Sequence, residues 1–131
     1  MNRQEELELA FIRACDLLKL AGFSFRPMLN RLGPVKNTKK AYRLGHINLK
    51  TKTVTIDIYT AKRRTPKKIS AVLSVMAHEL AHFQKPPFRQ RWRGRWINRI
   101  HYPKFYRQVN QNIKKFKRDK ILGKYFKSLF P

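Results

Sequence analysis

Residues 65–83 read Thr-Pro-Lys-Lys-Ile-Ser-Ala-Val-Leu-Ser-Val-Met-Ala-His-Glu-Leu-Ala-His-Phe, and this stretch decides the fold of the chain. Its large apolar residues recur at helical spacing, namely Ile69, Leu73, Met76, Leu80 and Phe83. That period is typical of a helix that packs one face on a core. Thr65 is a suitable N-cap, and Pro66 suits the first helical position, where no amide donor is needed. We therefore predict a central helix over about 66–84.

This helix contains an H-E-x-x-H motif, His78-Glu79-Leu80-Ala81-His82. Two imidazoles at positions i and i+4 share one helix face, and together they can hold a metal ion such as zinc. Glu79 is turned by about 100° from His78, where it can accept a proton from a metal-bound water. The alternative is a pair of surface histidines with no metal. It is weakened because a lone carboxylate in so apolar a helix is costly to bury.

A catalytic zinc uses three protein ligands and one water, so a third ligand is needed. The metzincin extension of the motif fails, because Lys85 and Phe88 occupy its glycine and histidine positions, and no glutamate follows Glu79. Side chains of the usual ligand types remain at His46, Asp57, His101 and Asp119. His101 is favoured, because it opens an amphipathic segment that can point one imidazole back at the central helix.

The other three candidates have ordinary alternative roles. His46 falls in a predicted hairpin and is expected to face solvent. Asp119 lies among lysines and is expected to form a surface ion pair. Asp57 either orients a ligand histidine or is simply a carboxylate on a strand face.

The remaining segments indicate a single α+β domain over residues 1–131. Asn2 and Glu5 form a capping-box-like start to an N-terminal helix. Residues 41–60 alternate as a β-hairpin with its turn near 50–52. A C-terminal helix is predicted from about 102, followed by a basic C-terminal extension. The single cysteine, Cys15, excludes a separate multi-cysteine zinc ribbon.

The charge balance is extreme, with 31 Lys and Arg against 7 Asp and Glu, which gives a net charge of +24. Such an excess implies a polyanionic partner, nucleic acid in the first place. Docking on an anionic membrane surface is the alternative. No stretch approaches the roughly 20 apolar residues of a membrane span. The acidic N-terminus does not resemble a secretion signal, so we expect an intracellular protein of the cytoplasm, nucleoid or nucleus.

Two basic clusters flank the metal motif in the sequence. The first lies within residues 61–68 and includes Arg63, Arg64, Lys67 and Lys68. The second interleaves arginine with tryptophan and comprises Arg89, Arg91, Trp92, Arg93, Arg95, Trp96 and Arg99. Guanidinium groups bind phosphates and indoles stack on unpaired bases, so both clusters are candidate nucleic-acid contacts. The alternative for the tryptophans is that they pack on one helical face in the core.

Two motifs, Ala77-His78-Glu79-Leu80-Ala81-His82 and His101-Tyr102-Pro103-Lys104-Phe105-Tyr106, resemble those of the SprT-like metallopeptidases. This family includes the Spartan proteases, which cleave DNA–protein crosslinks. The resemblance implies that His78, His82 and His101 bind zinc and that Glu79 is the catalytic base. Tyr102 stands where the family usually has glycine. The C-terminal zinc ribbon of many relatives is absent, so the basic surface itself would have to bind nucleic acid.

We therefore expect a zinc metalloendopeptidase that binds nucleic acid and cleaves DNA-associated or DNA-crosslinked proteins. Glu79 would act as general base for a zinc-activated water. Tyr102, Tyr106 and nearby arginines are candidate contacts for the oxyanion or the substrate. The alternative function is a non-catalytic basic nucleic-acid-binding or structural protein with a structural zinc. The oligomeric state and the physiological substrate are not predicted.

Overall fold

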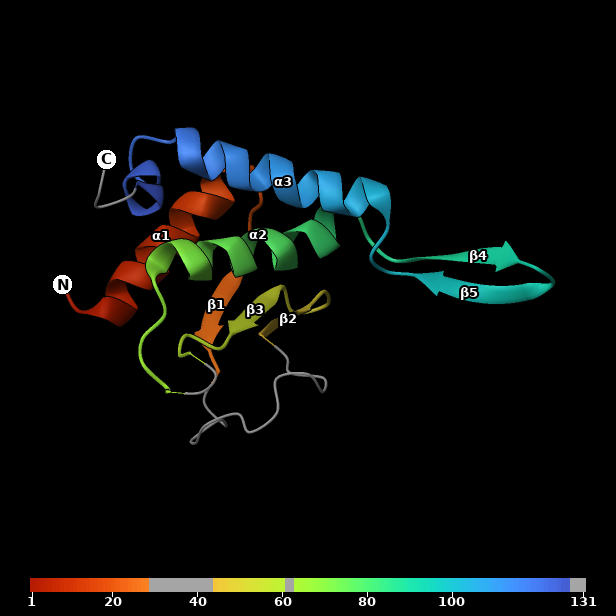
Figure 1. Cartoon of the computed structure of the whole chain (residues 1–131), viewed down its shortest axis with the longest axis horizontal. Helices are drawn as coiled ribbons and strands as arrows, with labels where there is room; N and C mark the ends of the chain where they lie inside the picture. Colours follow the sequence, from red (N-terminus) through yellow and green to blue (C-terminus); the bar gives the residue numbers. More distant parts are fainter. Residues whose placement is uncertain (29–43, 61–62, 128–131) are drawn as a thin grey trace.

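The computed structural model describes residues 1–28, 44–60 and 63–127 (Figure 1). In chain order these residues form α1 (Arg3–Leu17), β1 (Ser24–Pro27), β2 (Gly45–Asn48), β3 (Thr53–Ile56), α2 (Ile69–Gln84), β4 (Phe88–Trp92), β5 (Arg95–Arg99), α3 (Pro103–Arg118) and the 3₁₀ turn η1 (Gly123–Phe126). The predicted α+β class is confirmed, with helices at the N-terminus, in the middle and near the C-terminus.

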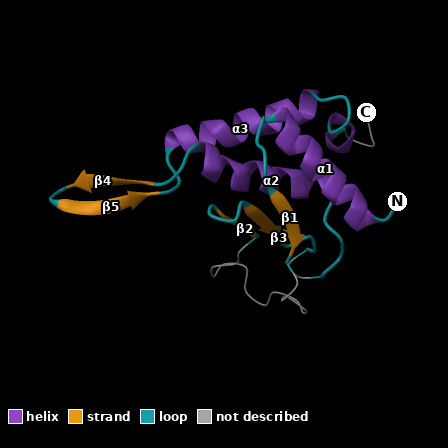
Figure 2. Cartoon of the chain, turned by 180° about the vertical axis from the view of Figure 1, so that it is seen from behind, coloured by secondary structure: helices purple, strands orange, loops and turns teal. Residues whose placement is uncertain are grey.

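The helix α2 lies at the centre of the fold. The sheet of β1, β3 and β2 covers one side of α2 and α3 packs on the other, while α1 contacts both helices (Figures 1 and 2). The side chains of Val72, Leu73, Met76 and Leu80 are completely buried between these layers. A helix that is covered on two sides must be apolar on more than one face, which explains the dense apolar composition of this stretch.

The sheet has the strand order β1-β3-β2, so β2 is an edge strand among the described residues. β2 and β3 pair antiparallel, which confirms the predicted hairpin over residues 45–56, and positions 41–43 lie outside the described residues. A Cβ atom on Gly45 would lie 3.0 Å from both Thr55 O and Val75 Cγ1. The absence of a side chain at Gly45 therefore lets the edge strand lie close against α2.

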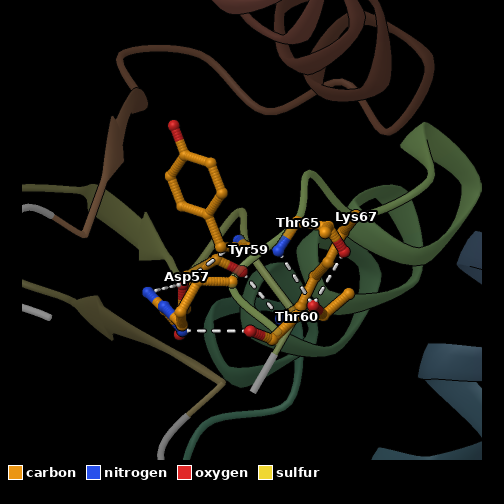
Figure 3. Close-up of polar contacts among 6 residues, drawn as sticks. Asp57, Tyr59, Thr60, Thr65 and Lys67 are labelled. Atoms are coloured by element: carbon orange, nitrogen blue, oxygen red, sulfur yellow. Dashed lines mark hydrogen bonds and ion pairs between the residues drawn. The ribbon is translucent and has the colours of Figure 1, made fainter. Parts of the chain in front are cut away.

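The start of α2 differs from the prediction. The helix begins at Ile69, so the predicted first position at Pro66 and the N-cap at Thr65 are wrong. Thr65 instead pairs with Thr60, whose N–H donates to the Thr65 carbonyl at 2.7 Å (Figure 3). Pro66 forms a β-bridge with Tyr59. Because these contacts hold the backbone in an extended conformation, helical geometry begins only after them.

Asp57, directly after β3, is completely buried and anchors the same loop (Figure 3). The Arg64 guanidinium donates to Asp57 Oδ1 and Oδ2 at 2.9 Å and 2.8 Å. The Lys67 ammonium donates to the Asp57 carbonyl oxygen at 2.7 Å. This bidentate contact satisfies the buried carboxylate, as burial requires, and it joins β3 to the segment that leads into α2.

The segment after α2 forms a β-hairpin, β4–β5, in place of a helix. Its turn is Arg93-Gly94, with φ of +49° and +76°, the combination that a two-residue type I′ turn needs. Pro86 and Pro87 stop the preceding helix at Gln84. The alternative in which Trp92 and Trp96 pack on one helical face is therefore wrong.

None of the helices in the described part of the chain combines the length and apolar character that a membrane crossing needs.

Candidate metal centre and arginine hairpin

The fold brings His78, His82 and His101 together, and each offers a ligand nitrogen within 4.8 Å of the other two. The ring centroids are 5.1 Å apart for His78 and His82, 5.3 Å for His78 and His101, and 5.0 Å for His82 and His101. Two of these histidines come from one face of α2, and His101 comes from the connection between β5 and α3. These three side chains could hold one metal ion.

The electrostatics of the pair on α2 suit a metal ligand. Burial, and then the neighbouring His78 and His101 rings, lower the pKa of His82 to about 4. Burial also lowers the pKa of His78, and His101 adds to that effect. Both rings are therefore neutral at pH 7 and keep the lone pair that a metal ion needs.

Phe105, on the first turn of α3, packs under the three imidazoles. Its ring centroid lies 5.0 Å from that of His78, 4.5 Å from that of His82 and 5.2 Å from that of His101, and its side chain is fully buried. Sequence analysis identified the motif that contains Phe105 but not its contact with all three rings. Such packing restricts the orientations of the imidazoles before any metal binds.

Asn112 fixes α3 onto α2 behind the histidines. Its fully buried side chain donates from Nδ2 to the carbonyl oxygen of Ala77 at 3.1 Å and to Gln84 Oε1 at 2.7 Å, and it accepts from Gln108 Nε2 at 2.9 Å. Sequence analysis missed this residue. The available signal was its position seven residues after Phe105, which places a polar side chain within the buried stripe of α3.

A cavity of about 990 Å³ opens beside the three histidines. It runs between the edge strand β2 and the helix α2, and its walls comprise residues 44–50, Ser74, Val75, His78, Glu79, His82, Pro87, Ile100 and His101. Glu79 is almost completely buried and lines this cavity together with the histidines. The carboxylate and the candidate metal ligands therefore line the same cavity.

The other candidate ligands have different surroundings. His46 is half-buried rather than solvent-facing. Gly45 lies against Val75 of α2 and Ile47 packs against the core, so strand alternation turns the side chain of His46 to the other face of the sheet. Its Nδ1 atom is buried and has no hydrogen-bond partner among the described residues. Asp119 forms an ion pair, in which Arg13 Nη2 lies 2.6 Å from Asp119 Oδ1, but the Asp119 side chain is only 5% exposed, so the pair is not the surface pair that was predicted. The Arg13 contact lowers the pKa of Asp119 to about 2.

The two candidate oxyanion tyrosines lie beside His101 but do not line the larger cavity. The hydroxyl of Tyr102 donates to the carbonyl oxygen of Pro86 at 3.0 Å, which ties the end of α2 to the start of α3. Tyr106 is half-exposed, and its ring centroid lies 6.1 Å from that of His101. A contact of either residue with substrate stays a prediction.

The hairpin of residues 88–99, here called the arginine hairpin, projects away from the helices (Figure 1). In the register of β4 and β5, Arg91 lies opposite Trp96 and Trp92 lies opposite Arg95. Cross-strand partners share a face and successive residues alternate, so Trp92 and Trp96 lie on opposite faces of the hairpin. Their side chains are 51% and 58% exposed, which shows that neither belongs to the core.

Each tryptophan is flanked by two guanidinium groups. Arg89 and Arg91 lie 5.3 Å and 5.8 Å from the Trp96 ring centroid, and Arg93 and Arg99 lie 5.6 Å and 5.7 Å from that of Trp92. All four guanidinium groups are within the distance of a cation–π contact with an exposed indole. The result is a cationic arm with an exposed indole on either face.

The basic cluster before α2 divides into two groups. The cationic groups of Arg64 and Lys67 are held by Asp57, whereas the side chains of Arg63 and Lys68 are exposed. Nucleic-acid contact is thus sterically easier for the second pair, and for all four residues it stays a prediction.

Comparisons of this chain with protein-family models, with curated proteins and with solved structures find no match. The resemblance to the SprT-like metallopeptidases rests on the two short motifs around His78 and His101. The function must therefore be inferred from the geometry of the site itself.

Proposed function

We propose that this chain is a zinc metallopeptidase of the SprT-like type, which binds nucleic acid and cleaves proteins that are associated with or crosslinked to DNA. The observation that carries the proposal is the convergence of His78, His82 and His101 with Glu79 in the wall of one open cavity. Catalytic zinc sites typically use three protein ligands and keep one position open, whereas structural sites are closed by four. The exposure of His101 supports the open kind.

The cavity suits an extended peptide. One of its walls is the edge strand β2, whose outer backbone groups pair with no described strand. Peptides commonly bind by adding a strand to such an edge, with backbone hydrogen bonds that do not depend on sequence. A peptide bound along β2 would pass over Val75 and the histidines of α2.

The donor set of three imidazoles fits zinc. When bound, zinc would supply Lewis acidity toward a carbonyl oxygen and would make water more acidic. Glu79 follows His78 directly in α2 and faces the same cavity, so its carboxylate can accept a proton from the attacking water. It can then pass this proton to the leaving amine, the usual double role of such a base.

The arginine hairpin supports the nucleic-acid part of the proposal. No Asp or Glu occurs between Leu80 and Arg118, so the hairpin and α3 form a surface of one sign next to the metal site. A two-stranded ribbon fits the major groove of B-form DNA, whereas the deep, narrow major groove of A-form RNA excludes it. A DNA-bound substrate would place the protein inside the cell, in the cytoplasm, nucleoid or nucleus.

The test is the Glu79→Gln variant, assayed on a protein crosslinked to DNA. The variant removes the base and leaves the three histidines in place, so it should still bind zinc. Its rate of proteolysis should fall by about 10²–10⁴-fold, the typical contribution of one positioned acid–base group. The matched control is Glu8→Gln, the same change at an exposed position of α1, which should keep the full rate.

An unchanged rate in the Glu79→Gln variant would contradict the proposed mechanism. If neither the variant nor wild type cleaves any protein while zinc and DNA are both bound, the alternative of a non-catalytic nucleic-acid-binding protein with a structural zinc would stand.

A further inference from the structure

A second, smaller hollow of about 480 Å³ lies where the arginine hairpin meets the first turns of α3. Its lining residues are Phe88, Gln90, Arg99, His101, Tyr102, Pro103, Lys104 and Arg107. The volume falls within the range of about 300–1,000 Å³ that is typical of small-molecule sites. The proposed peptidase chemistry assigns no role to this hollow, although one of its walls is a candidate metal ligand.

The hollow is strongly cationic. Arg99, Lys104 and Arg107 line it, and no carboxylate does. Lys104 and Arg107 make no hydrogen bond or ion pair with any described residue, and both side chains are exposed. Arg99 donates from Nε to Gln90 Oε1 at 2.9 Å, which orients its guanidinium and leaves its terminal N–H groups for another acceptor. Three cations without a counter-charge at one site favour an anionic ligand, and guanidinium groups favour phosphate.

The hollow also has an aromatic wall. The Phe88 and Tyr102 rings pack edge to face with centroids 5.0 Å apart, and the Tyr102 hydroxyl is occupied by the Pro86 carbonyl oxygen at 3.0 Å. These contacts fix the wall, while Phe88 remains 45% exposed. An exposed aromatic face beside unpaired cations is the combination that single-stranded nucleic acids use, with a base on the ring and a phosphate on the cations.

The register of the hairpin extends this surface outward. Phe88 lies opposite Arg99, and Gln90 and Trp92 follow Phe88 on the same face. The Arg99 guanidinium lies 5.7 Å from the Trp92 ring centroid, so it connects the hollow with the exposed indole farther along the hairpin. A strand bound in the hollow can therefore continue along this face.

We propose that this hollow is a nucleotide subsite, in which Arg99, Lys104 and Arg107 hold one backbone phosphate and Phe88 packs against its base. His101 lines both this hollow and the larger cavity. The nucleotide and the peptide would thus lie on two sides of the same residue, which would bring a protein bound to a nucleic-acid strand directly to the site of cleavage. The inference rests on the proposed function, because it names the part of the nucleic acid that is nearest to the metal centre.

The test compares two double variants of α3 in the full chain. Lys104→Gln/Arg107→Gln changes the hollow. Lys115→Gln/Arg118→Gln is the matched control, because it removes the same two residue types at the same spacing from exposed positions of the same helix. Binding of thymidine 5′-monophosphate, inorganic phosphate and a short oligothymidylate would be measured for each, with backbone amide shifts to locate the nucleotide.

We expect the first variant to bind thymidine monophosphate about 10–100-fold more weakly, since charge-assisted bonds to phosphate are lost, and the control to bind it like wild type. For oligothymidylate, the slope of log affinity against log salt should become less steep by about 0.7 in the first variant, the value for one phosphate of a single strand. In wild type, the amides of Phe88, Arg99 and His101 should shift. Phe88→Ala should weaken the nucleotide and leave inorganic phosphate unchanged.

Equal losses in both double variants, or shifts located elsewhere, would overturn the subsite. Binding of an acidic peptide with the same loss in the first variant would assign the hollow to a protein ligand and overturn it as well. The proposed function has a separate readout. If Arg91→Ala/Arg93→Ala/Arg95→Ala loses oligonucleotide binding while the hollow variant keeps it, the arginine hairpin still binds nucleic acid and only the subsite falls.

Discussion

The α2–α3 pair and the arginine hairpin are built on opposite principles. The helices bury Leu73, Met76 and Phe105 completely and keep their polar groups paired, as Asn112 is. In the hairpin, every residue of β4 is exposed, and β4 and β5 pair only with each other among the described strands. The helix pair holds three imidazoles close together, whereas the hairpin presents its arginine side chains to solvent.

The difference indicates how the two proposed functions could be joined in one small chain. The chain leaves α2 just after His82, makes the hairpin, and returns to the helices at His101. The third candidate ligand is therefore placed by the same connection that carries the arginines. Packing by Phe105 and Asn112 keeps the ligand end rigid. A Cβ atom on Gly94 would meet no other atom within 4 Å, so the tip of the hairpin is open.

The largest expected effect is on the hairpin side, in the response of DNA affinity to salt. If the arginines and lysines neutralise about 6–10 phosphates, affinity should fall by about 10³–10⁵ between 50 and 200 mM salt, because each neutralised phosphate releases counterions. Binding to single- and double-stranded oligonucleotides across a salt series measures this. The Arg91→Ala/Arg93→Ala/Arg95→Ala variant should show a shallower response.

A flat salt response would remove nucleic acid as the partner of the charge. A triple variant that binds like wild type would show that residues 89–99 are not the contact surface. Liposomes with anionic headgroups, tested at the same salt, distinguish a membrane partner from DNA.

On the helix side, the corresponding prediction concerns zinc. Loss of a residue that only hydrogen-bonds to a metal ligand can cost roughly 100-fold in metal affinity. His101→Ala should lower zinc affinity by more than this, because it removes a ligand itself. His46→Ala is the control, because His46 lies outside the group of three. Elemental analysis and competition with a chelator measure both variants. Loss of zinc from the His46 variant with retention in the His101 variant would show that the ligand set is wrong.

The candidate metal site was largely predictable because two of its three histidines lie within one helix. The spacing of His78 and His82 determines their relation in any α-helix, and only the position of His101 required the tertiary fold. The hairpin was not predicted, because tryptophans at 92 and 96 fit either a helix or a ribbon, and the type I′ turn at Arg93-Gly94 has an unusual first residue. The predicted start of α2 was wrong because a tertiary contact outweighed the local sequence signal. Thr65 is a good capping residue, but its backbone pairs with that of Thr60 instead.

The next prediction concerns the hydrogen bonds of Asn112 that join α3 to α2 and their contribution to stability. Asn112→Ala would leave the Ala77 carbonyl oxygen and the Gln84 side chain without their buried donor, and such a loss costs about 1–3 kcal/mol of unfolding free energy. Gln111→Ala, at the exposed neighbouring position, should stay within about 0.5 kcal/mol of wild type. Denaturant unfolding of the zinc-free chain measures the difference. Equal stability of the two variants would show that this network does not hold α3 on α2.

The smallest expected effect on stability belongs to the tryptophans, and it separates packing from recognition. Because Trp92 and Trp96 are more than half exposed, replacing either by alanine should change the free energy of unfolding by no more than about 0.5 kcal/mol. If each indole stacks on a base, each replacement should instead weaken single-strand binding by about 1–3 kcal/mol. Thermal unfolding and fluorescence titration measure the two quantities on the same proteins.

The double variant makes this prediction sharper. The two rings lie on opposite faces and share no guanidinium partner, since Arg93 and Arg99 flank Trp92 while Arg89 and Arg91 flank Trp96. Their binding losses should therefore add to within about 0.5 kcal/mol, as for independent sites. The contradicting outcome is a double variant that binds single strands as tightly as the single variant with the lower affinity. That result would mean that both rings contact one base. Two rings on opposite faces can do so only if the hairpin rearranges on binding. If each replacement lowers the free energy of unfolding by as much as it weakens single-strand binding, both tryptophans have a purely structural role.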